Sequence, residues 1–142
     1  MKKFLLLFFM IFSLSAGAFA KSFKSVSVAE KFVSSVVDQF SDGNFKEAMD
    51  SMKPYCKLSE SKIDSLVEQT GLQWSLIENN YGKKIDTELV YSKEAGKSLV
   101  MLAHLARFER SPLVFYTILY RTDEGWEIVG FSFKDSVSEL FD

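Results

Sequence analysis

The chain has 142 residues, 47% of them hydrophobic, and carries 17 basic and 19 acidic side chains. This balance lacks the surplus of Lys and Arg that a nucleic-acid surface needs to neutralise phosphates, so we expect no nucleic-acid partner. One His and one Cys are too few for a Cys/His zinc cage, a haem attachment motif or a disulfide within the chain. We therefore expect no metal and no cofactor, and no high-specificity catalytic motif is present.

Residues 1–20 have the three-part layout of a secretory signal peptide. Lys2 and Lys3 form a short cationic start, residues 4–14 are almost entirely apolar, and residues 18–20 read Ala-Phe-Ala. The apolar run is well short of the roughly 20 residues that cross a bilayer as a stable helix, which makes an uncleaved anchor the weaker alternative. We expect cleavage after residue 20, no stable membrane insertion afterwards, and a periplasmic or secreted product.

Residues 21–142 are expected to form a single domain. Removing residues 1–20 takes away two basic residues and no acidic residue, which leaves 15 basic and 19 acidic residues and a formal charge of −4. The chain has only two prolines and no Gly/Ser-rich tract, so there is no sign of a linker. A chain of this size can support one compact hydrophobic core.

Three helices are predicted in the first half of this domain. The first begins at a capping box, Ser27-Val28-Ala29-Glu30, and the second lies between Asn44 and Pro54. The third begins at Ser59 or Ser61 and stops at Gly82. Apolar residues at helical spacing define their buried faces. In chain order these faces are Ala29, Phe32, Val33, Val36, Val37 and Phe40; Phe45, Ala48, Met49 and Met52; and Ile63, Leu66, Val67, Trp74 and Ile77.

Four strands are predicted in the second half. Ile85, Thr87, Leu89 and Tyr91 alternate with other residues at the period of a half-buried strand. Residues 98–108, 113–121 and 126–133 are rich in branched and aromatic side chains and are separated by turn residues. Residues 98–108 also fit a helix face, but the strands around them favour a strand in a meander. The last residues, 134–142, are expected to be either a frayed tail or a short docking segment.

Two local features carry a resemblance to a known architecture. Asp42-Gly43-Asn44-Phe45 breaks the chain after the first helix, and an acidic-Gly turn leads into Trp126-Glu127-Ile128-Val129-Gly130-Phe131. With the order of helices and strands, these features resemble the nuclear transport factor 2-like (cystatin-like) superfamily, and in particular its small exported bacterial members of unknown function. The resemblance implies an α+β fold in which N-terminal helices pack in a strongly curved antiparallel four-stranded sheet, a cone-shaped roll. In that superfamily the cone interior can hold a ligand, and dimers often form through the outer face of the sheet.

The same resemblance gives a test for catalytic residues. Ketosteroid isomerases of this superfamily combine a carboxylate base with a Tyr and a protonated carboxylic acid in an apolar pocket, and this sequence assigns none of those roles by motif. His104, Tyr116 and Asp86 are the candidates that an enzyme would use, since an imidazole titrates near neutrality. An ordinary packed or exposed position explains each of them more simply, so no catalytic residue is assigned.

A second set of residues are candidates for binding. His104, Tyr116, Trp126 and Tyr91 are candidates for lining a pocket, although a Trp that opens the last strand is more often part of the core. Phe131 and Phe133 alternate with small residues, so one side of the last strand is strongly apolar, and if that side looks outward it is an interface.

Three functions stay open. The preferred one is an exported noncatalytic binding or protein-interaction module of the bacterial envelope, because aromatic residues are plentiful and catalytic groups are scarce. We expect it to form a homodimer and to take a small apolar ligand or an envelope protein as partner. The alternatives are an inhibitor or immunity-type protein directed against an envelope enzyme, and a small isomerase- or dehydratase-like enzyme that uses the cone pocket. The third requires a buried polar side chain that faces a cavity.

Overall fold

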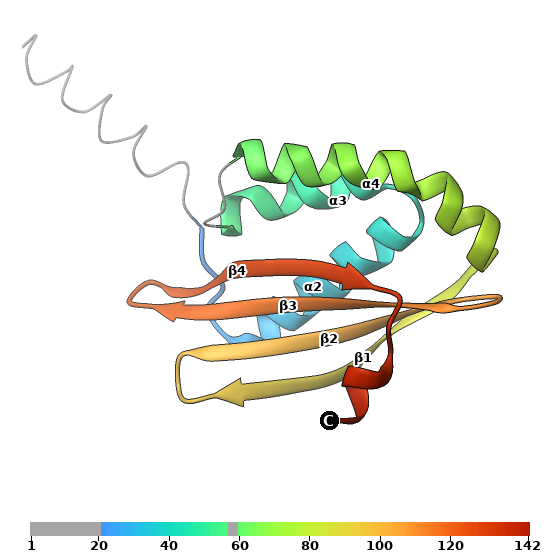
Figure 1. Ribbon diagram of the computed structural model, residues 1–142. Helices are drawn as coiled ribbons and strands as arrows, with labels where there is room; N and C mark the ends of the chain where they lie inside the picture. The colour runs from blue at the N-terminus through green and yellow to red at the C-terminus, as the bar shows by residue number, and fades with distance from the viewer. Residues whose placement is uncertain (1–20, 57–59) are drawn as a thin grey trace, which may run out of the picture.

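The fold is that of the computed structural model, which describes residues 21–56 and 60–142; the signal peptide predicted for residues 1–20 lies outside this range. Helices come first and an antiparallel sheet follows, so the predicted α+β class is confirmed (Figure 1). The helices cover one face of the sheet. The elements are α2 (Val26–Ser41), α3 (Phe45–Met52), the 3₁₀ turn η1 (Lys53–Tyr55), α4 (Glu60–Tyr81), β1 (Lys84–Ala95), β2 (Leu99–Phe108), β3 (Pro112–Thr122), β4 (Gly125–Lys134) and the 3₁₀ turn η2 (Ser138–Phe141).

The first helix starts slightly earlier than the capping box predicts. Ser25 is the N-cap of α2, and its side chain accepts a 3.2 Å hydrogen bond from the backbone N–H of Val28. The predicted box at Ser27 is therefore wrong by two residues. Both serines can cap, and Ser25 lies two residues after Phe23, whose backbone is paired to β4 and fixes where the chain can turn into a helix.

The sheet is an open meander with the order β1-β2-β3-β4, so β1 and β4 are its edges. Residues 99–108 form a strand, which settles the choice between helix and strand at this segment. In β2 the even-numbered residues face the helices, because Leu102 and Ala106 belong to the buried cluster that includes helix residues. His104 lies on the same face, opposite Phe115 of that cluster. The odd-numbered residues, with Ala103 at their centre, face away from the helices.

The predicted alternation along β1 is wrong in its second half. A register shift between Leu89 and Tyr91 moves the following side chains to the opposite face, so Leu89 lies across from His104 whereas Tyr91 lies across from Ala103. Ile85 and Leu89 are also 55% and 41% exposed, and are not buried as a half-buried strand requires. As an edge strand with helical cover only near its start, β1 has little to pack against.

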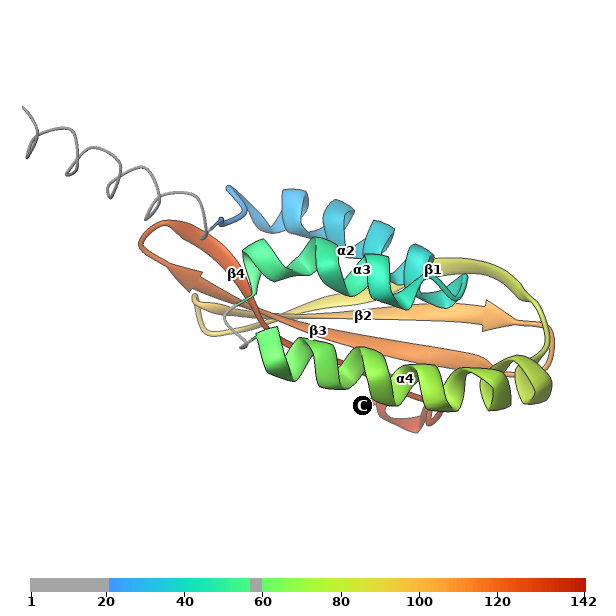
Figure 2. The same cartoon turned by 90° about the horizontal axis from the view of Figure 1, so that it is seen from above.

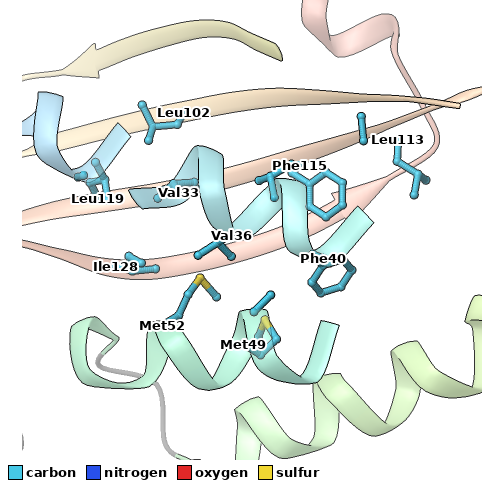
Figure 3. Packing of buried hydrophobic residues seen from close by; sticks show 14 of the residues in the cluster. Val33, Val36, Phe40, Met49, Met52, Leu102, Leu113, Phe115, Leu119 and Ile128 are labelled. Carbon is cyan, nitrogen blue, oxygen red and sulfur yellow. The ribbon is translucent and has the colours of Figure 1, made fainter. Parts of the chain in front are cut away.

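The main core lies between α2, α3 and the helix-facing side of the sheet (Figure 3). Phe40 is 2% exposed and occupies its centre, where its ring contacts five other aromatic rings. Edge-on and tilted aromatic contacts of this kind add to the free energy gained from burial alone. The five rings are those of Phe45, Trp74, Phe115, Phe131 and Phe133, at centroid distances of 5.3–6.0 Å.

Helix α2 lies against the sheet, α3 packs on α2, and α4 lies on the β4 side (Figure 2). Helix α4 is 22 residues long and continues through Gly71 without a break. Its buried residues include Thr70 and Trp74, whereas Leu72 and Leu76 are 78% and 60% exposed. Among residues 21–56 and 60–142, no helix combines the length and the apolar character that crossing a membrane requires.

The two ends of the described domain are both held against the sheet. Phe23 exchanges two backbone hydrogen bonds with Trp126, at 2.8 and 2.9 Å, and its ring stacks on Tyr55. At the other end, Val137 and Leu140 pack on the sheet face opposite the helices. Residues 134–142 are therefore a docking segment, which resolves the two alternatives left by the sequence.

Candidate functional site

His104 lies in the core of the domain. It is 1% exposed on β2, and its Nε2 is 2.9 Å from the hydroxyl of Ser34 on α2. Its Nδ1 has no hydrogen-bond partner among the described residues. Burial lowers the pKa of His104 from 6.5 to about 4, so the ring is neutral at neutral pH.

The described surroundings of His104 lack the second hydrogen-bond partner that normally orients a histidine acting as a general base. A base that activates a serine is normally oriented by a third group on its other nitrogen, and here that nitrogen faces no acceptor or donor in the described part of the chain. The residue opposite on β3 is Phe115, which is fully buried. A buried neutral imidazole paired with one hydroxyl is best explained as part of the core.

Tyr116 and Tyr91 lie on the opposite face of the sheet from His104. Both pair with Ala103, the neighbour of His104 in β2, whose side chain points the other way. Tyr116 is 8% exposed, and burial raises the pKa of its phenol. The Tyr91 hydroxyl is 3.8 Å from the sulfur of Met101. The structure therefore separates these two tyrosines from His104 by the thickness of the sheet.

Asp86 is also on the outer face, where Arg107 binds it through two nitrogens at 2.6 and 2.7 Å. The Arg107 guanidinium lowers the pKa of the Asp86 carboxyl, which keeps Asp86 ionised. A carboxylate that is held this way is a poor proton donor. His104, Tyr116 and Asp86 do not converge on one point.

Trp126 is the second residue of β4 and lies next to the N-terminal segment. Its backbone pairs with Phe23, and its partly buried side chain packs on the main core. Gly125, directly before it, has φ = +141°, and a Cβ there would be 2.5 Å from the carbonyl oxygen of Phe23. The acidic-Gly turn predicted from the sequence thus makes room for the N-terminal segment.

Phe131 and Phe133 face the helices. Their rings lie 5.9 and 5.3 Å from that of Phe40, and both are only partly buried. The sequence predicted an interface here only if this side of the strand faced outward, and it faces the helices. The two phenylalanines instead line one wall of an apolar pocket.

This apolar pocket opens between α4 and the edge strand β4, and we call it the α4–β4 pocket. Its volume is about 150 Å³. The only side-chain hydroxyl from a helix, that of Thr70, is already bonded to the carbonyl oxygen of Leu66 at 2.6 Å. The lining residues are Phe40, Met49, Leu66, Thr70, Phe131, Ser132 and Phe133.

A shallow groove runs along the first turns of α4, and Leu66 lines both this groove and the pocket. The groove has a volume of about 400 Å³ and contributes one cationic side chain, Lys62. Its other lining residues are Ser61, Ser65 and Gln69. An apolar pocket beside a groove that holds one lysine suits a group with one apolar and one anionic end.

A third cavity, of about 430 Å³, lies where the ends of α2 and α4 meet the start of β1 and the end of β2. Its charged groups are largely used within the chain. Lys84 binds the carboxylates of Asp38 and Asp42, and Arg110 donates to two carbonyl oxygens at the end of α4. This arrangement holds the ends of the helices to the sheet.

The sequence contained part of the signal for the α4–β4 pocket. Leu66 and Met49 were on predicted apolar helix faces, and Phe131 and Phe133 were on a predicted apolar strand side. Thr70 was missed, although it lies four residues from both Leu66 and Trp74 on the same helix face. Within the described residues no cluster of three or more His, Cys, Asp or Glu side chains could hold a metal ion.

Comparison of the chain with protein-family models, with curated proteins and with solved structures gave no match.

Proposed function

We propose that this protein is a noncatalytic binding module of the bacterial envelope and that its binding site is the α4–β4 pocket. The observation that carries this proposal is the apolar pocket of about 150 Å³ at the edge of the sheet, lined by Phe131 and Phe133. An apolar cavity of about this size is large enough for a ring such as benzene. We expect an apolar group of similar size to occupy it.

The distribution of the reactive side chains supports binding over catalysis. His104 is buried on the helix-facing side of the sheet, whereas Asp86 and Tyr116 are on the other side. An acid–base mechanism needs its groups within hydrogen-bond reach of one substrate. None of the three lines the α4–β4 pocket.

The proposal keeps three expectations from the sequence. Residues 1–20 are removed as a signal peptide, residues 21–142 are periplasmic or secreted, and the domain is a cone-shaped roll of the nuclear transport factor 2-like kind that forms homodimers. In support of the domain boundary, Phe23 is buried and paired to β4 only a few residues after the expected cleavage site. N-terminal sequencing of the protein from a periplasmic fraction should begin at Lys21, and finding Met1 there would refute the export proposal.

The pocket is tested by binding of an apolar fluorescent dye, 1-anilinonaphthalene-8-sulfonate. The wild-type protein should enhance its fluorescence saturably. Thr70→Phe fills the pocket and should abolish the enhancement, whereas Thr70→Val loses the same hydroxyl without filling the space and should retain it. Near-ultraviolet circular dichroism checks that both variants are folded.

A second pair of variants avoids a change in the core. Leu66 is only half-buried at the pocket, so Leu66→Glu places a charge there with little effect on folding, and Leu72→Glu places the same charge on an exposed part of α4. Dye binding should be lost in the first and kept in the second. Equal binding by Leu66→Glu, Thr70→Phe and wild type would refute the pocket as the binding site.

A further inference from the structure

The most exposed large apolar side chain in the described part of the chain is that of Phe141, at 87%. It ends η2, the turn that is anchored to the outer sheet face through Val137 and Leu140. An ion pair between Lys134 and Glu139, at 3.1 Å, also holds this turn. Phe141 is thus an aromatic ring in solvent on a segment that is fixed to the sheet.

The α4–β4 pocket matches Phe141 in size and character. The pocket has a volume of about 150 Å³ and an apolar lining that includes two phenylalanines, and a cavity of about that size can hold a benzene ring. Burying a phenylalanine ring removes a large apolar surface from water, which favours association. Phe141 is 87% exposed, so its own chain buries little of this ring.

Charge is complementary on the two sides as well. Asp142 follows Phe141 directly, and Lys62 lines the groove that shares Leu66 with the pocket. A phenylalanine in the pocket with its neighbouring aspartate in the groove would place a carboxylate near an ammonium group. Such a pair at an interface rim contributes mainly to orientation and to the rate of association.

The occupant comes from another molecule, because the sheet separates the two features within one chain. The pocket is on the helix-covered side of β4, where Phe40 and Met49 contribute to it. The turn η2 packs against Ala103, Val114 and Tyr116 on the opposite side, and Figure 1 shows the C-terminal segment near β1, at the other edge of the sheet from α4.

We propose that the α4–β4 pocket takes Phe141 of a second copy of this chain, with Asp142 of that copy over the groove that contains Lys62. This inference rests on the proposed function, since it names the occupant of the same pocket. The contact joins two different surfaces. Two copies that exchange it reciprocally form a closed dimer, and copies that do not close form longer assemblies.

The first test is the mass of the purified protein, residues 21–142, by light scattering across micromolar to millimolar concentrations. Wild type should exceed the monomer mass, and Phe141→Ala should require a concentration more than about tenfold higher to do so. Leu72→Ala removes another highly exposed side chain, 78% exposed on α4, and should assemble like wild type. A strictly monomeric wild type, or a Phe141→Ala variant that assembles as wild type does, would overturn the proposal.

The second test is complementation. Phe141→Ala keeps the pocket and lacks the ring, whereas Thr70→Phe keeps the ring and fills the pocket. Each alone should stay monomeric where wild type assembles, and an equal mixture should form a complex that contains one copy of each, as seen by native mass spectrometry. Thr70→Val should behave as wild type. A mixture that assembles no better than either variant alone would overturn the proposal; if Thr70→Phe does not fold, Leu66→Glu takes its place.

Dye binding separates failure of this inference from failure of the proposed function. Saturable dye binding that Thr70→Phe abolishes, together with assembly that is indifferent to Phe141→Ala, would keep the pocket as a binding site and refute the second copy as its occupant. A small molecule retained by wild type and by Phe141→Ala alike would have the same meaning. Dye binding that survives in Thr70→Phe would refute the pocket itself.

Discussion

His104 and Ser34 are joined by a hydrogen bond of 2.9 Å across the core, although 70 residues separate them in the chain. The bond ties β2 to α2 at a point where the surrounding side chains are apolar. It satisfies one ring nitrogen and leaves the other without a partner among the described residues. The protein therefore keeps its single imidazole neutral inside the fold.

The stability of the domain should fall as the pH is lowered, and His104 should account for part of this loss. The folded-state pKa is about 4 and the ordinary value is 6.5, so below pH 6.5 the unfolded chain takes up a proton that the folded chain does not. The free energy of unfolding should thus lose about 1 kcal/mol per pH unit between pH 6 and pH 4 from this residue. Above pH 7 the residue should contribute no pH dependence.

Urea unfolding of wild type and His104→Leu at pH 7.5, 6, 5 and 4.5 measures this contribution. Carboxylates also titrate in this range, and the difference between the two proteins removes their effect. The free energy of unfolding of wild type should decrease steadily relative to that of His104→Leu as the pH falls. Parallel stability curves would show that His104 is not kept neutral by the fold.

Gly125→Ala should destabilise the domain through the N-terminal segment. The glycine has φ = +141°, and a Cβ would be 2.5 Å from the carbonyl oxygen of Phe23, so the chain must either strain or release the pairing with β4. We expect a loss of about 3 kcal/mol. Gly96→Ala is the matched control: its φ is +67° with no atom within 4 Å of the added Cβ, and the cost should be about 1 kcal/mol. Chemical denaturation measures both, and equal losses would refute the steric argument.

Phe40→Ala should be among the most damaging single substitutions in the domain. It removes a ring that is 2% exposed and contacts five others, and we expect the free energy of unfolding to drop by about 3–5 kcal/mol. Leu72→Ala, at a side chain that is 78% exposed, should change it by less than about 0.5 kcal/mol. A loss below about 2 kcal/mol for Phe40→Ala would mean that the core collapses readily around the missing ring.

Lys84→Met should test how β1 is held to the end of α2. Lys84 binds the carboxylates of Asp38 and Asp42; burial opposes its charge, but these two partners raise its pKa. We expect a loss of about 1 kcal/mol that shrinks in concentrated salt, because the two partners are half-exposed. The exposed neighbour Lys83 provides the control Lys83→Met, which should have little effect. A salt-independent loss would point to packing of the Lys84 side chain.

Much of the fold was predictable because its helices and strands have strong local patterns. Apolar spacing identified α2, α3 and α4, and turn residues separated four strands, including the segment 99–108 that also fits a helix. The errors came from effects that local patterns do not contain. Ser25 caps α2 because the pairing of Phe23 with β4 determines where the chain enters the helix, and a register shift after Leu89 reverses the faces of β1.

The candidate site was less predictable, because adjacent residues in a strand point to opposite faces of the sheet. His104 and the tyrosines were grouped by residue type, and the sheet separates them. Phe131 and Phe133 were recognised as an apolar side, but only the placement of α4 beside β4 turns that side into one wall of a pocket.

By itself the sequence determined the class of fold, the order of its elements, and the scarcity of groups that could bind a metal or carry out catalysis, because these follow from local spacing and from composition. The tertiary structure alone decided which faces meet. It buried His104 beneath α2, put Tyr91 and Tyr116 on the far face, and opened a pocket between α4 and β4. These outcomes depend on contacts between segments far apart in the chain, whose register and packing no local pattern encodes.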